Sequence, residues 1–344
     1  MKVGLVTGKR KVELVEMPTP EPTPGKAVVA ISYCGICGTD VHAYLSGAPY
    51  NPANCGHEWV GHVDKLGSNV TQVKAGDRVA IGVASACGRC ATCHRGDAAH
   101  CETAFAGAIG VGPMAAAHGG FASSIAFDAE RLYHVPKGLT DIQAGLLEPA
   151  TVAVHALRRT PINLGDSVVI IGAGPIGLLV LQAAKLSGAG RLVLVEPEAT
   201  RRMLGTQLGA TLTIDPSEED AATLINEHIR GNGADVVFEC AGVPATIQTS
   251  VDLVRRGGVV SLVGVATSDA SINAANWLVK EVRLVSSIAY LHEDFEICKA
   301  LVEDGRIQTD LLHTRTVGLT ELDDAFNRLA DHPAEVKILV DPRL

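Results

Sequence analysis

The sequence predicts an α/β protein built from a β-rich region and a doubly wound, six-stranded parallel sheet, and three observations predict this class. Short apolar runs alternate with helical stretches from Gly165 to about Ser286, which is typical of a parallel sheet flanked by helices. The chain instead begins with residues 1–15, which alternate apolar and polar residues, and a proline-rich turn follows them. The 344 residues, with 36 glycines and 47% hydrophobic residues, suffice for two domains with a large core and many tight turns.

The β-rich region occupies the first part of the chain. Residues 1–15 alternate in polarity and predict the start of an antiparallel hairpin, and the four prolines from Pro18 to Pro24 exclude helix and sheet ladder after it. The Gly- and Ala-rich residues 104–121 lack periodicity and predict a flexible loop, in which we expect His118 to be exposed rather than to face a substrate. Further strands are predicted at 27–33, 121–127 and 131–135, and a helix at 144–157.

The second half supplies the parallel sheet. Its strands are predicted at 168–171, 192–196, 211–214, 235–239, 258–264 and 282–286. Helices at 293–304 and 320–330 and a last strand at 336–340 then return to the first domain. We therefore expect residues 1–152 and 288–344 to form one domain, and residues 153–287 to form the parallel-sheet domain.

A glycine-rich turn joins the first strand of that sheet to the helix after it. The turn reads Gly172-Ala173-Gly174-Pro175-Ile176-Gly177 and follows an apolar, β-branched run that is typical of a buried strand. Gly172 permits a tight turn, Gly174 lets a pyrophosphate approach the backbone, and Gly177 lets the helix pack on the strand. Pro175 and Ile176 are the first residues of the helix, and we expect the free N–H groups at its N-terminus to bind the pyrophosphate.

An acidic residue completes this dinucleotide signature. Glu196 ends the next strand, nineteen residues after Gly177, and is placed to accept hydrogen bonds from a ribose 2′-hydroxyl. The alternative is a glycine turn that binds nothing, but the strand, helix and acid around it favour cofactor binding. Glu196 would repel a 2′-phosphate, so NAD is favoured over NADP. Arg201 and Arg202 instead favour NADP, because an arginine can pair with that phosphate. The alternative is that both lie on a solvated helix face and bind no cofactor.

The composition excludes several classes of partner. The net charge is −9 and no basic block occurs, so we expect no binding to nucleic acid or to anionic membranes. No apolar stretch approaches the length of a membrane span, and residues 1–20 do not have the pattern of a signal peptide. With nine cysteines and no export signal, we expect reduced thiols and a cytoplasmic protein.

Four of these cysteines have the spacing of a metal site. Cys87, Cys90, Cys93 and Cys101 are separated by two, two and seven residues, so their thiolates can converge on one ion as a tetrahedron. Four thiolates leave no open position, so the lobe at about 87–101 predicts a structural zinc. A redox dithiol and chance clustering are the alternatives, and both are disfavoured because a redox pair does not need the other two cysteines.

A second metal site is expected in the β-rich region. A catalytic zinc keeps three protein ligands and one open position. Cys37 and His57 lie in glycine-flanked segments and are the natural first two ligands. The residues alone do not identify the third ligand, for which Glu58 and Glu148 are both candidates.

Five motifs in combination point to a known family. They are Cys37-Gly38-Thr39-Asp40-Val41-His42, Gly56-His57-Glu58, the four-cysteine lobe, Glu148-Pro149-Ala150-Thr151-Val152-Ala153-Val154-His155 and the glycine-rich turn. With them the chain resembles the zinc-dependent medium-chain alcohol dehydrogenases over essentially its whole length. Within that family it most resembles the 2,3-butanediol dehydrogenases, and next the sorbitol and threonine dehydrogenases.

The resemblance implies a GroES-like catalytic domain and a Rossmann domain, with one catalytic and one structural zinc per subunit. It assigns the catalytic zinc to Cys37, His57 and Glu148. It makes Glu58 a nearby carboxylate that replaces a ligand during turnover. It also makes Asp40 the residue that orients His57 through the second ring nitrogen.

The activity that the resemblance implies is an NAD-dependent alcohol dehydrogenase (EC 1.1.1.-). Zinc would lower the pKa of the substrate hydroxyl, Thr39 would accept its proton, and the cofactor ribose would pass the proton to His42. We expect the substrate to be a secondary alcohol or vicinal diol and the product a ketone. The alternatives are a sorbitol-, polyol- or threonine-type substrate, a bulkier secondary alcohol, or a zinc- and nucleotide-binding scaffold without activity. Family members are often dimers or tetramers, and an exposed edge strand at 282–286 also predicts a homo-oligomer.

Overall fold

The computed structural model of the protein describes residues 1–332 and 334–344. The chain divides into two compact units, each of which is described by itself. Unit 1 comprises Met1–Glu148, Ala289–Glu303 and His313–Leu344, and unit 2 comprises Pro149–Ile288 and Asp304–Leu312. Among the described residues, every helix is too short or too polar to cross a membrane.

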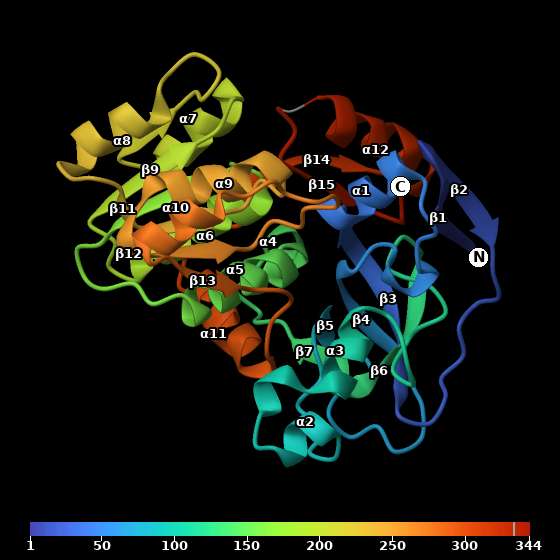
Figure 1. Ribbon diagram of the computed structural model, residues 1–344. Helices are drawn as coiled ribbons and strands as arrows, with labels where there is room; N and C mark the ends of the chain where they lie inside the picture. Colours follow the sequence, from blue (N-terminus) through green and yellow to red (C-terminus); the bar gives the residue numbers. More distant parts are fainter. Residues whose placement is uncertain (333) are drawn as a thin grey trace. The chain divides into compact units, whose positions relative to one another are not determined.

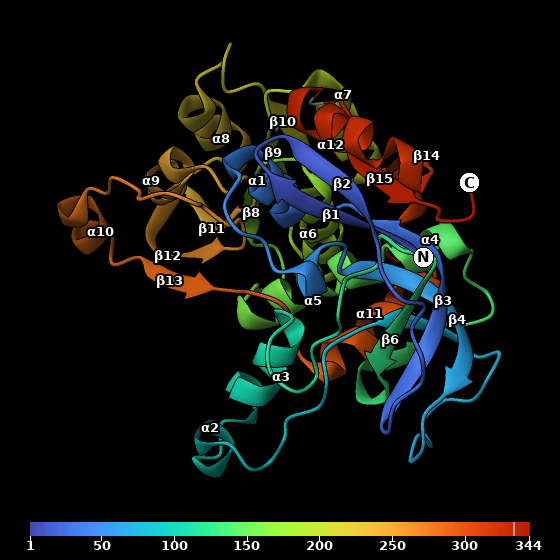
Figure 2. The ribbon, with the colours of Figure 1, turned by 90° about the vertical axis from the view of Figure 1, so that its right-hand side faces the viewer.

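Unit 2 is built around a parallel sheet (Figures 1 and 2). In its described residues the sheet has six strands in the order β10-β9-β8-β11-β12-β13, which confirms the predicted doubly wound sheet. The central strand β8 is buried along its whole length, as expected for apolar residues covered on both faces. The strands are β8 (Ser167–Ile171), β9 (Arg191–Val195), β10 (Leu212–Ile214), β11 (Ala234–Glu239), β12 (Val254–Leu262) and β13 (Arg283–Ser286).

The strand order places a switch point between β8 and β11. From β8 the chain leads toward β9 on one side, and from β11 it leads toward β12 on the other, which is the arrangement at whose carboxyl ends doubly wound sheets generally bind ligands. Helix α6 packs on β8 and β9, and α9 packs on β11 and β12. The helices of unit 2 are α6 (Pro175–Leu186), α7 (Ala199–Leu208), α8 (Ala221–Ile229), α9 (Pro244–Leu253) and α10 (Ala274–Lys280), and α5 (Leu147–Arg159) lies in this unit from Pro149 onward.

A buried glutamine explains why Asp304–Leu312 belongs to unit 2. Gln182 on α6 is 4% exposed, and its side-chain oxygen accepts from the backbone nitrogen of Gln308 at 2.8 Å. The amide nitrogen of Gln182 donates to the carbonyl of Gln308 at 3.3 Å. Both polar ends of the side chain are therefore satisfied by one backbone segment.

Unit 1 holds the β-rich part of the chain. In the part that the structure describes, seven strands form one sheet with β14-β15-β3-β4-β5-β7 in order and β6 beside β3, while β1 and β2 form the predicted hairpin. The strands are β1 (Lys2–Gly8), β2 (Lys11–Glu16), β3 (Lys26–Gly35), β4 (Glu58–Leu66), β5 (Arg78–Ile81), β6 (Ser124–Asp128), β7 (Leu132–His134), β14 (His313–Val317) and β15 (Lys337–Val340).

Two predictions about the helices of unit 1 are corrected. Residues 104–121 are not a loop throughout, because α3 (Glu102–Ala108) forms there with the thiol of Cys101 accepting from the nitrogen of Ala104 at its start. Only Ala104 and Gly107 of α3 are buried, so the sequence shows no apolar periodicity. The predicted helix at 144–157 is split at Leu146 into α4 and α5. The helices of unit 1 are α1 (Gly38–Ser46), α2 (Ala91–His94), α3, α4 (Asp141–Gly145), α11 (His292–Glu303) and α12 (Leu322–Asp331).

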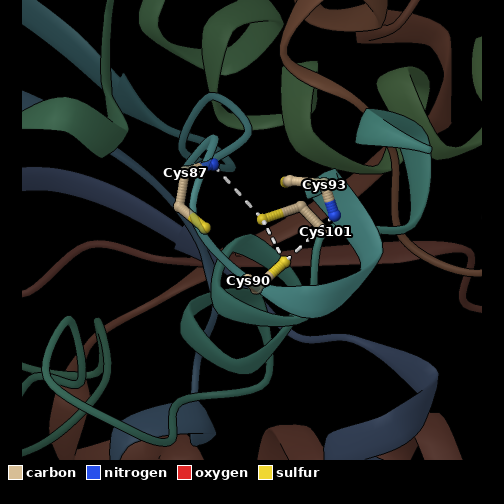
Figure 3. A group of neighbouring side chains, drawn as sticks. All are labelled: Cys87, Cys90, Cys93 and Cys101. Carbon is tan, nitrogen blue, oxygen red and sulfur yellow. Dashed lines mark hydrogen bonds between the residues drawn. The ribbon is translucent and has the colours of Figure 1, made fainter. Parts of the chain in front are cut away.

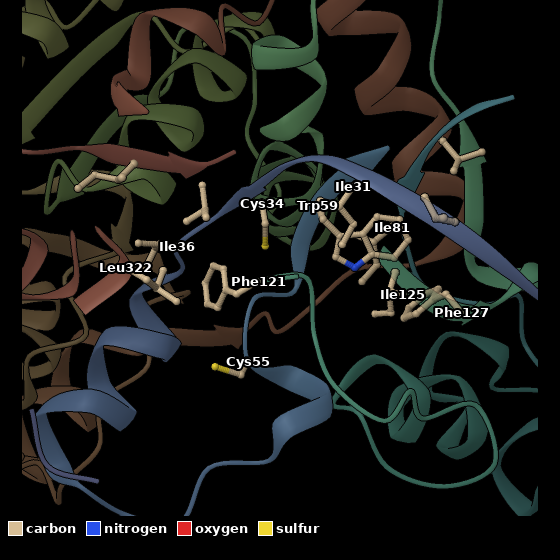
Figure 4. Packing of buried hydrophobic residues seen from close by; sticks show 14 of the residues in the cluster. Ile31, Cys34, Ile36, Cys55, Trp59, Ile81, Phe121, Ile125, Phe127 and Leu322 are labelled. Atoms are coloured by element: carbon tan, nitrogen blue, oxygen red, sulfur yellow. The ribbon is translucent and has the colours of Figure 1, made fainter. Parts of the chain in front are cut away.

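The core of unit 1 lies against β3 and β4 (Figure 4). Trp59 is 1% exposed and meets the edge of Phe127 at a centroid distance of 5.0 Å. Phe121 meets Phe326 in the same way at 6.0 Å. Edge-to-face pairs of this kind stabilise beyond their buried area. Because Trp59 directly follows Glu58, its packing holds the start of β4 in place.

Candidate metal and cofactor sites

The first candidate site lies where β3 ends and β4 begins. These strands pair antiparallel with Gly35 opposite Glu58, so Cys37 and His57 become neighbours although they are twenty residues apart. The ligand atoms of Cys37, His57 and Glu58 all lie within 4.8 Å of one another. Ligand atoms around a tetrahedral zinc are about 3.3–3.8 Å apart, so a small closure would fit this donor set to the ion.

The ring of His57 makes its hydrogen bond to a backbone carbonyl, and Asp40, the residue predicted to orient it, is the more distant partner of the same nitrogen. Nδ1 of His57 lies 2.8 Å from the carbonyl oxygen of Asn54 and 3.9 Å from Oδ1 of Asp40, so the backbone carbonyl orients the ring. Asp40 is fully buried and instead accepts from Tyr50 Oη at 2.8 Å and from the backbone nitrogens of Cys37 and Gly56 at 3.0 and 3.2 Å. It therefore ties together the two segments that carry Cys37 and His57.

The charges around His57 favour its protonated form. Burial lowers the pKa of this imidazole, but the thiolate of Cys37 and the carboxylate of Asp40 together raise it well above its ordinary value. A dication between these groups would supply the positive charge in place of that proton. The electrostatics of the group are therefore those of a cation site.

Sequence reasoning missed Lys337, the first residue of β15. Its side chain is 2% exposed, and Nζ donates to Oε2 of Glu58 at 2.6 Å and to the carbonyl of Ile36 at 2.9 Å. Burial lowers the pKa of Lys337, but the charges of Glu58 and Cys37 outweigh it and raise the pKa. Gly35 makes room for the pair, because a Cβ there would lie 2.3 Å from Oε2 of Glu58.

Glu148 lies beside this group but outside the 4.8 Å cluster that Cys37, His57 and Glu58 form. Tyr290 donates a hydrogen bond to its carboxylate. Burial raises the pKa of Glu148 to about 7, the charge of His57 opposes this shift, and that of Glu58 adds to it. Two carboxylates thus face one imidazole and one thiolate.

Thr39 and His42 follow Cys37 on α1. They are three residues apart, so their side chains lie on the same face of the helix, and both are partly buried. Helix α1 begins with Cys37 as its N-cap and ends at Gly47, which has a φ of +69°. The metal-site thiol and the two predicted proton-transfer residues therefore belong to one short, well-capped element.

The second candidate site is the four-cysteine lobe (Figure 3). The thiol groups of Cys87, Cys90, Cys93 and Cys101 all lie within 4.8 Å of one another, so this donor set also fits a tetrahedral ion. A hydrogen bond from Thr103 lowers the pKa of Cys87 to about 6, whereas burial raises that of Cys93 to about 12. All nine cysteines lie in the described residues, and each is free of a disulfide.

The glycine-rich turn of unit 2 has the geometry of a phosphate cradle. Gly172 has a φ of +96°, and a Cβ there would approach the backbone of Ala241 to 2.9 Å. A Cβ on Gly177 would lie 1.9 Å from the carbonyl oxygen of Gly172, so only glycine lets α6 approach the turn. A Cβ on Gly174 would meet nothing within 4 Å. The space before the first N–H groups of α6, which begins with Pro175 and Ile176, is therefore open for a pyrophosphate.

Glu196 joins this turn to the end of β9. Its carboxylate is 5% exposed and accepts from the nitrogens of Ala173 at 2.6 Å and Glu198 at 3.0 Å. Arg202 is engaged elsewhere, with Asp215 at 2.9 Å and with the carbonyl of Glu196 at 2.7 Å. Burial lowers the pKa of Arg201, while the charge of Glu196 raises it, so this cation lies near the same carboxylate.

The prediction that His118 is an exposed loop residue is wrong. Its side chain is 3% exposed, and Nδ1 lies 2.7 Å from the carbonyl oxygen of Gly119. Burial lowers its pKa, so the ring is neutral near pH 7. Gly119 explains the burial, since a Cβ there would lie 1.9 Å from the carbonyl of Cys55 and this close approach draws the segment inward.

Comparison with known proteins gives a consistent result. The chain matches the families described as "Alcohol dehydrogenase GroES-like domain" over residues 23–137 and "Zinc-binding dehydrogenase" over residues 175–303. It is 34% identical to the sorbitol dehydrogenase of Halalkalibacterium halodurans over 94% of both chains. The crystal structure of 2R,3R-butanediol dehydrogenase from Bacillus subtilis is 30% identical, with a TM-score of 0.83 over 99% of each chain. A zinc-binding dehydrogenase from Sinorhizobium meliloti, solved with NADP, is 31% identical, with a TM-score of 0.85 over 99% of each chain.

Proposed function

Because the chain belongs to the zinc-dependent medium-chain alcohol dehydrogenase family, we propose that it transfers hydride between a secondary alcohol or vicinal diol and NAD, giving the ketone. Membership of the family confirms the predicted resemblance and makes the chain an oxidoreductase. The observation that carries the proposal is the convergence of a thiol, an imidazole and a carboxylate within 4.8 Å in a chain that also has an open glycine turn for a dinucleotide.

The substrate class follows from the relatives. The names of the two similar enzymes are those of sorbitol and butanediol dehydrogenases, and both compounds carry adjacent secondary hydroxyl groups. We therefore expect a vicinal diol to be oxidised faster than an isolated secondary alcohol. The alternatives are a longer polyol, a threonine-type substrate and a bulkier secondary alcohol.

A substrate panel with and without metal tests the proposal. Reduction of NAD is measured with small diols, sugar alcohols, threonine and cyclic alcohols, before and after removal of metal by a chelator. We expect turnover with at least one alcohol, loss of that turnover on chelation, and recovery on adding Zn²⁺. Turnover that survives metal removal would contradict the proposal. Absence of turnover with every alcohol would also contradict it, and would support the alternative of a zinc- and nucleotide-binding scaffold.

In the proposed mechanism the chain's own residues hold the metal and move one proton. Bound zinc would lower the pKa of a substrate hydroxyl, as it lowers that of water from 15.7 to about 7. Cys37 and His57 would hold the metal; Asp40 fixes the backbone of Cys37, and the carbonyl of Asn54 holds the ring of His57. Thr39 would accept the substrate proton, and His42 would return it to solvent, because an imidazole can both accept and donate a proton.

The third ligand is a choice between two carboxylates. The close approach of Glu58 to Cys37 and His57 supports Glu58 as the ligand, while family resemblance supports Glu148. We propose that Glu58 binds the metal in the substrate-free enzyme and that Glu148 is the neighbouring carboxylate. Zinc content at limiting zinc separates them, because Glu58→Gln would then lose more metal than Glu148→Gln. The reverse order would assign the ligand to Glu148.

We propose NAD rather than NADP as the cofactor. The buried carboxylate of Glu196 beside the glycine turn supports this choice, since it would repel a 2′-phosphate. Replacing Glu196 with glutamine keeps its size and removes the charge. We expect the ratio of kcat/KM for NADP to that for NAD to rise about tenfold, which corresponds to about 1.4 kcal/mol. An unchanged ratio, or a wild type that prefers NADP, would contradict the assignment.

We propose that the four-cysteine lobe binds a second, structural zinc, giving two ions per chain. Four thiols within 4.8 Å of one another support this reading, and their need for the reduced state supports a cytoplasmic location. Cys101→Ser is expected to lower the zinc content by one ion and to lower the melting temperature. It should leave the binding of NADH, measured by fluorescence, unchanged. A variant that keeps both ions would contradict the assignment.

We also propose a homo-oligomer, a dimer or a tetramer, that forms along β13. This strand pairs only with β12 among the described residues, and nearby Leu278 and Leu284 are 79% and 47% exposed. Leu284→Glu is expected to shift the protein toward the monomer in light scattering after size exclusion. Leu164→Glu is the control, because Leu164 is 92% exposed elsewhere in unit 2. A shift with both variants, or with neither, would contradict assembly through β13.

A further inference from the structure

One buried carboxylate in unit 2 has no part in the function described so far. Glu239 ends β11 and is 1% exposed. Its Oε1 accepts three hydrogen bonds, from the backbone nitrogens of Ala241 and Gly242 at 3.0 Å each and from Oγ1 of Thr246 at 2.7 Å. Its Oε2 is buried and has no hydrogen-bond partner among the residues that the structure describes. A buried carboxylate oxygen without a partner costs stability, so it requires an explanation.

The backbone of Glu239 extends the same connection to the next strand. Its carbonyl oxygen accepts from the nitrogens of Val263 at 2.9 Å and Gly264 at 2.8 Å, just after β12. A Cβ on Gly264 would lie 2.6 Å from Oε2 of Glu239 and 2.3 Å from the nitrogen of Gly242. Glu239 therefore holds together the turn after β11 and the turn after β12, which meet backbone to backbone.

The turn after β11 also touches the dinucleotide cradle. A Cβ on Gly172 would lie 2.9 Å from the nitrogen and Cα of Ala241, and a Cβ on Gly177 would lie 3.4 Å from Cβ of Cys240. The cradle after β8 thus rests directly on the segment that Glu239 orders. Strands β8 and β11 flank the switch point at which a dinucleotide crosses a doubly wound sheet.

We propose that Glu239 is a positioning residue for the dinucleotide, and this inference rests on the proposed function. By accepting three donors on one oxygen, its carboxylate holds residues 240–246 in one conformation before the cofactor arrives. A segment that is already ordered loses less conformational freedom when the dinucleotide binds. Glu239 can therefore raise the affinity for the dinucleotide without touching it. The position that lets Oε1 accept these three hydrogen bonds leaves Oε2 buried without a partner, and this lowers the stability of the fold.

The test is the affinity of NADH for Glu239→Gln, measured by fluorescence titration of the full-length, zinc-loaded protein. Glutamine keeps the size but removes the charge, which weakens all three hydrogen bonds to Oε1. We expect the Kd for NADH and the KM for NAD to rise about tenfold, with kcat at saturating NAD within about twofold of the wild type. A change in melting temperature alone, with Kd and KM unchanged, would make Glu239 purely structural and overturn the proposal.

The same strand provides a matched control. Asp235, near the opposite end of β11, also accepts three hydrogen bonds, from the backbone nitrogen of Ser167 at 2.8 Å, from its Oγ at 2.7 Å and from Nε of Arg255 at 2.6 Å. Asp235→Asn should lower the melting temperature but leave the Kd for NADH within about twofold of the wild type. Equal weakening of NADH binding by both variants would indicate general destabilisation and overturn the inference.

Two further outcomes separate this inference from the proposed function. If Glu239→Gln does not fold, Thr246→Val removes one of the three donors and is expected to weaken NADH binding in the same direction by a smaller factor, with Thr246→Ser restoring it. A Thr246→Val variant with wild-type affinity would overturn the proposal. If the wild type itself does not bind NADH, the proposed function fails, and the inference fails with it.

Discussion

Replacing His57 with alanine is expected to abolish alcohol oxidation while leaving the binding of NADH intact. His57 contributes one of the three donor atoms that lie within 4.8 Å at the junction of β3 and β4, whereas the glycine turn belongs to unit 2. A metal that polarises a substrate oxygen supplies several kcal/mol of transition-state stabilisation, so kcat should fall by at least about a thousandfold. The measurements are initial rates of NAD reduction, zinc content, and fluorescence titration with NADH.

The zinc content of His57→Ala tests the role of this residue more directly than the loss of activity does. His57→Ala should lose one of the two proposed ions, because the four-cysteine lobe is an independent donor set. His62→Ala is the matched control, since this histidine lies five residues further along on β4 and is exposed. It should retain both ions and the full activity. A His57→Ala variant that oxidises alcohols at the wild-type rate would remove the metal from the mechanism.

The sequence predicts most reliably what is local in the chain. The glycine turn, the strands on either side and Glu196 lie within thirty residues of one another, and the structure brings them together as expected. The four cysteines likewise lie within fifteen residues and converge. In both cases short-range geometry decides which side chains meet. This geometry consists of the periods of strand and helix and the length of a turn.

Contacts between distant segments could not be predicted in this way. Lys337 and Glu58 are 279 residues apart, and the pair forms because β3 lies between β4 and β15. The hydrogen bond that orients His57 could not be predicted for a different reason. A backbone carbonyl, that of Asn54, competes for the same ring nitrogen, and carbonyls are present at every position of a sequence. The burial of His118 could not be predicted either, because the close approach of Gly119 to Cys55 is a tertiary contact.

The pair of Lys337 and Glu58 supports the second large prediction. Replacing Lys337 with methionine leaves the carboxylate of Glu58 buried without its ammonium partner, and breaking a buried pair in this way costs about 3–5 kcal/mol. We expect a loss of that size in the free energy of unfolding of unit 1, measured in urea on metal-free protein. Trp59 lies in the core of unit 1 and reports its unfolding once the other tryptophan is removed by Trp277→Phe.

An exposed ion pair in the same unit provides the control. Arg10 and Asp331 also lie in unit 1 and are joined at 2.7 Å, but their side chains are 43% and 48% exposed. Water screens this pair and solvates whichever partner remains, so Arg10→Met should shift the urea midpoint far less than Lys337→Met. Equal shifts for the two variants would mean that burial of the Lys337 pair has no special energetic role.

The double variant Lys337→Met/Glu58→Gln distinguishes a buried charge from lost packing. If the cost of Lys337→Met comes from the unpaired carboxylate, neutralising Glu58 as well should recover most of the lost stability, and the two changes will be strongly non-additive. If the cost comes from the lost packing of the lysine chain, the double variant will be less stable than either single one. With zinc added, Lys337→Met should recover part of its stability, because the metal supplies positive charge beside the same carboxylate. Failure to recover would show that Glu58 does not face the metal.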